Sequence, residues 1–70
     1  MKRREVLSKL AAEAKRKGQP FRTVELKRHT GVIVGAVHST LKRHAEIEDD
    51  AARKFFDQFA AVLGKGWWRK

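Results

Sequence analysis

Residues 23–47 read TVELKRHTGVIVGAVHSTLKRHAEI, and this stretch decides the predicted fold. A short polar segment, residues 23–30, leads to Gly31, and a longer segment with cations toward its end follows. Because glycine adopts a positive φ without steric cost, we interpret Gly31 as a sharp turn between two helices. In the second helix, residues 33–47, apolar side chains recur every three or four positions, which predicts one buried face.

Part of this stretch also fits a strand. The segment VIVGAV, residues 32–37, is rich in β-branched side chains, which are typical of buried strands. A single strand has no partner for its backbone, and we recognise no second strand with hairpin signals in the sequence. We therefore predict a helix and keep the strand as the alternative.

Amphipathic segments lie on both sides of this stretch. The segment before it and the segment after it both carry apolar side chains at helical spacing. Together they predict an all-α fold, a small four-helix domain in which a wing is absent or rudimentary. This single domain covers residues 1–70, with helices at about residues 2–17, 23–30, 33–47 and 50–63 and a basic aromatic tail at residues 64–70.

The C-terminal part carries most of the aromatic side chains. The apolar face of the predicted fourth helix either closes the core or forms a homodimer contact, because an apolar patch of this size is rarely left in water. This face consists of Phe55, Phe56, Phe59 and Leu63. In the tail, Trp67, Trp68 and Arg69 either contact a nucleic acid by stacking or fold back onto the domain.

The charge of the chain indicates a polyanionic partner. With 70 residues, the formal net charge is +9 and the sequence pI is about 10.7. Nucleic acid is the first partner that such a charge suggests, and an anionic membrane is the second. Excess charge can also serve solubility alone, but +9 lies above the usual range for a small domain.

Several function classes are not supported by the sequence. The chain has no cysteine, and His29, His38 and His44 lack the spacing of a zinc site, so we expect no metal and no cofactor. No apolar run reaches the length of a membrane span, and we expect a cytoplasmic protein. Nucleophile–base pairs and phosphate-binding glycine loops are not recognised either, so we predict that the protein is not an enzyme.

Residues 23–47 resemble the helix-turn-helix of winged-helix-like DNA-binding domains. The match lies in ELKRHTGV and VHSTLKR, where Gly31 resembles the turn glycine. By this resemblance, residues 33–47 would be the recognition helix in a major groove. Its groove-facing residues would be Ile33, Val34, Gly35, Ser39 and Lys42, with His38 and Arg43 at the edges.

The sequence thus predicts a small basic protein that binds double-stranded DNA and regulates transcription. Arg22, Arg28, Lys42 and Arg43 would neutralise phosphates, and a dimer would place two recognition helices about 34 Å apart. Two alternatives remain. One is a helical adaptor that binds a protein of the transcription or replication machinery, and the other is an RNA-binding protein that uses the same basic face.

Overall fold

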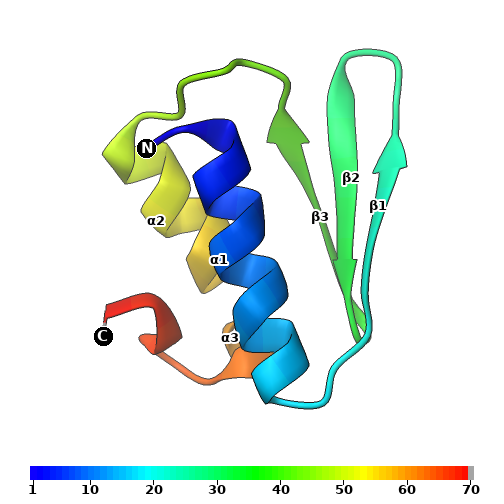
Figure 1. Cartoon of the computed structure of the whole chain (residues 1–70), viewed down its shortest axis with the longest axis vertical. Helices are drawn as coiled ribbons and strands as arrows, with labels where there is room; N and C mark the ends of the chain where they lie inside the picture. Colours follow the sequence, from blue (N-terminus) through cyan, green and yellow to red (C-terminus); the bar gives the residue numbers. More distant parts are fainter. Residues whose placement is uncertain (70) are drawn as a thin grey trace.

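Three antiparallel strands form one layer of the protein and helices form the other, in a computed structural model that describes residues 1–69 (Figure 1). Lys70, the last residue of the predicted tail, lies outside the described residues. The strand order is β1-β2-β3, so neighbours in the chain are neighbours in the sheet. The elements are α1 (Arg3–Arg16), β1 (Phe21–Glu25), β2 (His29–Val34), β3 (Val37–Lys42), α2 (Asp49–Asp57), α3 (Ala60–Leu63) and the 3-10 helix η1 (Trp67–Arg69).

The sheet forms because side chains in residues 21–42 alternate between its two faces. On β2, Thr30, Val32 and Val34 are buried beneath the helices, which is the period of two that a half-covered strand shows. The β-branched side chains that favour extended backbone supply most of this strand. The opposite face of the sheet, which no helix covers, carries the intervening residues (Figure 1).

Tight turns join the strands. Gly35 begins the turn between β2 and β3, and its φ of 57° is one that glycine adopts without strain. Lys27 and Arg28 form the tip of the turn between β1 and β2, where the Leu26 N–H donates to the His29 carbonyl at 2.8 Å. These turns fix the register in which Glu25 pairs with Thr30 and Val34 with Val37.

The predicted all-α, four-helix fold is wrong, and so is the helix-turn-helix within it. Residues 23–30 belong to β1, the first turn and the start of β2, and residues 33–47 contain the end of β2, all of β3 and an irregular link. Gly31 is not a hinge but lies in the middle of β2, opposite Val24 of β1 and Thr40 of β3. A Cβ atom on Gly31 would lie 3.3 Å from the Val24 carbonyl oxygen. The strand alternative is confirmed up to Val34, after which the chain turns.

The helical predictions outside this stretch hold better. The helix predicted at residues 2–17 is confirmed as α1. The helix predicted at residues 50–63 is divided into α2 and α3, because the N–H groups of Gln58 and Phe59 bond carbonyls three residues back and tighten the chain there. Among residues 1–69, no helix has both the length and the apolar character needed to cross a membrane.

The core lies between the sheet and the helices and is centred on aromatic rings. Phe55 and Phe59 meet edge to face with centroids 5.2 Å apart, and Phe56 and Trp67 do so at 5.0 Å. The Trp67 Nε1–H donates to the Phe56 carbonyl at 3.0 Å, so the polar end of the indole is satisfied inside the protein. This bond holds η1 against α2.

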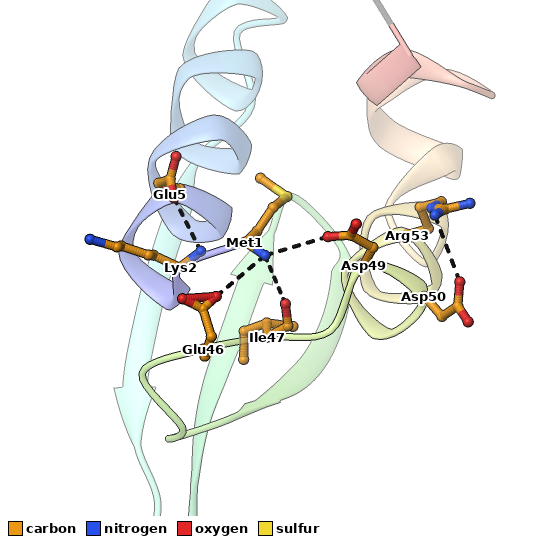
Figure 2. Close-up of polar contacts among 8 residues, drawn as sticks. All are labelled: Met1, Lys2, Glu5, Glu46, Ile47, Asp49, Asp50 and Arg53. Carbon is orange, nitrogen blue, oxygen red and sulfur yellow. Dashed lines mark hydrogen bonds and ion pairs between the residues drawn. The ribbon is translucent and has the colours of Figure 1, made fainter.

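The start of α1 is held beside the link between β3 and α2 (Figure 2). The Ile47 N–H donates to the Met1 carbonyl at 2.7 Å, and the Met1 amine donates to the Ile47 carbonyl at 2.9 Å. The same amine lies 3.4 Å from a carboxylate oxygen of Asp49 and 3.6 Å from one of Glu46. These contacts bring the first residues of α1 next to the end of β3.

Candidate nucleic-acid interface

Three cationic segments, distant in the sequence, meet at one end of the sheet. They are the start of α1, the turn between β1 and β2, and the end of β3. The Arg3 N–H donates to the Ala45 carbonyl at 2.8 Å, and an Arg43 guanidinium N–H donates to the Leu26 carbonyl at 2.7 Å, so all three are directly linked. We name this group the basic end: Lys2, Arg3, Arg4, Lys27, Arg28, Lys42 and Arg43.

A chain of polar contacts runs through the basic end. The Arg3 guanidinium donates to the Thr30 hydroxyl, which is 1% exposed and itself donates to a Glu25 carboxylate oxygen at 2.9 Å. The same oxygen lies 3.1 Å from an Arg43 guanidinium nitrogen. Glu25 therefore contacts Arg43 directly and is connected to Arg3 of α1 through the Thr30 hydroxyl.

The surface at the basic end is hollowed rather than flat. One hollow of about 520 Å³ lies between the start of α1 and the link after β3. Its lining side chains are Lys2, Arg3, Arg4, Arg43, Ala45 and Glu46. A second hollow of about 380 Å³ is lined by Arg3, Glu25 and Arg43. Exposed cations around hollows of this kind can bind phosphate oxygens.

The uncovered face of the sheet continues from the basic end. We name it the outer face; its side chains alternate with the buried ones and come from Arg22, Val24, Leu26, His29, Ile33, His38, Thr40 and Lys42. Val24 and Leu26 are each 43% exposed, and cations or imidazoles flank them. Phenylalanine and tryptophan side chains are absent from this face, and its rings are the imidazoles of His29 and His38.

The structure brings some of the predicted DNA-binding residues together and separates others. Arg28 and Arg43 belong to the basic end, and Lys42 belongs both to it and to the outer face. Arg22 and His38 lie on the outer face, in one row across the sheet with Ile33 between them.

Gly35 and Ser39 do not lie with the others. Gly35 is in the turn at the far end of the strands, where its N–H donates to the Pro20 carbonyl at 2.9 Å. The Ser39 hydroxyl points to the helical side of the sheet and donates to the Gln58 side-chain oxygen. Neither is placed to contact a ligand at the basic end.

The C-terminal residues predicted to form a core or dimer face, or to contact nucleic acid, are buried to different degrees. Phe55, Phe56, Phe59 and Leu63 are buried in the core, and so is Trp67. Trp68 is partly exposed; its Nε1–H donates to the Asp57 carboxylate at 2.7 Å, and the Arg69 guanidinium lies 5.0 Å from the centre of its ring. One tryptophan is thus part of the core, and the other is held at the surface between two charged side chains.

Two cations outside the basic end, Arg16 and Arg53, form ion pairs within their own helices. Glu13 accepts two hydrogen bonds from Arg16, at 3.1 and 3.0 Å. These bonds, and then the carboxylate charge, raise the pKa of Arg16. Arg53 lies 3.7 Å from Asp50. These pairs are formed within single helices, whereas the basic end joins cations from three segments.

Sequence reasoning missed several members of the site. Lys27, Thr30 and Glu25 were assigned to a short helix, and Arg3 was assigned only to the helix predicted at residues 2–17. A usable signal was present, because pairs or runs of cations recur at residues 2–4, 27–28 and 42–43. These segments are seen to meet only in the fold, through the pairing of the three strands and the contact of Arg3 with the link after β3.

Comparison of the chain with known protein families, curated proteins and solved structures gives no match. Within residues 1–69, no group of three or more histidine, cysteine or acidic side chains is arranged to hold a metal ion. The functional groups that the site offers are guanidinium, ammonium, imidazole, hydroxyl and carboxylate groups.

Proposed function

We propose that the protein binds nucleic acid through the basic end and that its preferred ligand is double-stranded RNA. The observation that carries this proposal is the meeting of three cationic segments at one end of the sheet, linked by the contacts of Arg3 and Arg43. Seven lysines and arginines on one small surface supply the electrostatic contacts that dominate binding to phosphates.

The number of strands in the sheet favours RNA over DNA. Adjacent strands lie about 4.8 Å apart, so the three backbones span roughly 10 Å, one strand more than a two-stranded ribbon. The major groove of B-DNA is about 12 Å wide and admits a helix or a two-stranded ribbon. The minor groove of A-form RNA is wide and shallow and presents 2′-hydroxyls and phosphates, which suits the outer face together with the basic end.

Binding of single strands by base stacking is less well supported. Stacking needs exposed aromatic rings next to cations. Trp67 is buried, and Trp68 is held by Asp57 and Arg69. The outer face offers only imidazoles, which are the smallest aromatic rings among the side chains. The contacts available are directed at phosphates and sugars, so we expect recognition of duplex shape with little dependence on base sequence.

The other functions considered from the sequence lose their main support. A helical adaptor could bind a protein partner through the apolar run at residues 32–37, but Val32 and Val34 are buried under the helices. The regulator hypothesis needed a recognition helix, and residues 37–42 form a strand instead. We therefore propose a protein that binds RNA duplexes in the cytoplasm.

Titration of labelled duplexes tests this proposal. We expect an RNA duplex of about 16 base pairs to bind more tightly than a DNA duplex of the same sequence and than either RNA strand alone. With about four phosphate contacts, log K should fall with log salt with a slope near −4 between about 50 and 200 mM salt. A flat salt dependence would refute nucleic-acid binding, and a preference for DNA would refute the RNA assignment alone.

A further inference from the structure

The Glu25 carboxylate occupies an unusual position for an acid at a phosphate-binding surface. It projects from the end of β1 into the hollow that it lines with Arg3 and Arg43. One of its oxygens accepts from the Thr30 hydroxyl at 2.9 Å and lies 3.1 Å from the Arg43 guanidinium. It is thus an anion that is paired with Arg43 and connected to Arg3, the other cation of the hollow, through the Thr30 hydroxyl.

We infer that this position, between Arg3 and Arg43, is a phosphate subsite that Glu25 fills in the free protein and leaves when a phosphate of the nucleic acid binds. The inference rests on the proposed function and specifies one ligand group, a backbone phosphate. Carboxylate and phosphate oxygens are recognised by the same guanidinium geometry, so one can replace the other between these two arginines.

The contacts of Arg43 allow such an exchange. The side chains of Arg43 and Glu25 are 46% and 62% exposed, so the ion pair between them is in contact with water. Pairs of this kind contribute little to stability. Arg43 also donates to the Leu26 carbonyl at 2.7 Å, which keeps its guanidinium in place when the carboxylate leaves.

Arg3, which lines the same hollow, has a donor without a partner. Its Nε–H is buried and has no hydrogen-bond partner, although its terminal nitrogen donates to the Thr30 hydroxyl. A buried donor without an acceptor is unfavourable. A small movement of the Arg3 side chain toward a phosphate in the hollow would supply that acceptor.

The substitution Glu25→Gln tests the inference. Glutamine keeps the shape and an oxygen that accepts from Thr30 and Arg43, but it removes the competing charge. We expect Glu25→Gln to bind the RNA duplex roughly two- to fivefold more tightly, which is the size of effect that exposed charge pairs produce. Equal or weaker binding by a variant with an unchanged melting temperature would overturn the inference.

A matched control separates this effect from general charge. Asp50→Asn also removes one carboxylate from an exposed ion pair, with Arg53, but at the start of α2 and outside the basic end. We expect less than about a twofold change, since screening weakens the field of an exposed charge over a Debye length. If both variants gain affinity equally, long-range charge explains the result and the subsite is refuted.

Arginine Nε–H resonances give a readout that does not need RNA. On titration with inorganic phosphate, the Arg3 and Arg43 signals should shift together, and in Glu25→Gln they should shift at lower phosphate concentration. Unmoved signals would refute the subsite even where RNA binds. Shifted signals in a protein that fails to bind RNA would refute the proposed function and leave the subsite supported.

Discussion

Reversing the charge of Lys27 and Arg28 should weaken binding to an RNA duplex by about two orders of magnitude near 0.1 M salt. Both side chains are exposed at the tip of the turn between β1 and β2, so their replacement by glutamate removes two cations and adds two anions without disturbing the core. The slope of log K against log salt should become shallower by about 2, one for each lost phosphate contact. Fluorescence anisotropy at several salt concentrations measures both quantities.

The control for this variant reverses two other exposed cations. Lys15 and Lys17 lie at the opposite end of α1 from the basic end. Changing both to glutamate alters the net charge by the same amount but should lower affinity much less. An equal loss in the two double variants would mean that total charge, rather than the basic end, attracts the nucleic acid.

Replacing Phe56 by alanine should leave the protein largely unfolded. Phe56 is 2% exposed, meets Trp67 edge to face and accepts the Trp67 indole hydrogen bond at its carbonyl. Removal of a buried phenylalanine ring costs about 3–5 kcal/mol. That is roughly the whole net stability of a single core in a domain of this size.

Circular dichroism and urea unfolding measure this effect. Leu26→Ala is the matched control, because Leu26 is 43% exposed on the outer face and its truncation should change the free energy of unfolding by less than about 0.5 kcal/mol. A cooperative unfolding transition for Phe56→Ala, with less than about 1 kcal/mol lost, would show that η1 and α2 do not form the centre of the core.

The helices could be predicted from the sequence because their apolar side chains recur at helical spacing and end at clear stops. Val6, Leu10 and Ala14 define the buried face of α1, and Gly18 has the positive φ of a residue that ends a helix. The same periodicity located Phe55, Phe56 and Phe59. Only the tightening near Gln58, which divides the predicted helix, has no signal in residue type.

The sheet was not predicted because some of its buried residues also fit the spacing of a helix. Val34, Val37 and Leu41 are spaced three and four apart and fit a helical face, although they pack inward from neighbouring strands. The better signal was Thr30, Val32 and Val34, which alternate and are buried. The Gly35 turn was read as part of a helix, and Lys27-Arg28 is not a residue pair that predicts a turn.

The candidate site was partly visible in the sequence and partly hidden by this error. Cations such as Arg28, Lys42 and Arg43 can be recognised in the sequence from residue type alone. The position of Arg3 beside Thr30 and Glu25 depends on pairing between strands and on the bonds between the start of α1 and the link after β3. Contacts over such sequence distances are set by the tertiary fold and leave no local pattern.

The most direct test of the account is to map the RNA contact residue by residue on the backbone amides of the ¹⁵N-labelled protein. On addition of an RNA duplex, the amides that shift should be those of residues 2–4, 25–30 and 42–45, which form or flank the basic end, with smaller shifts along the outer face. Shifts confined to α2, α3 and η1, or spread evenly over the chain, would contradict the assignment of the basic end as the nucleic-acid interface.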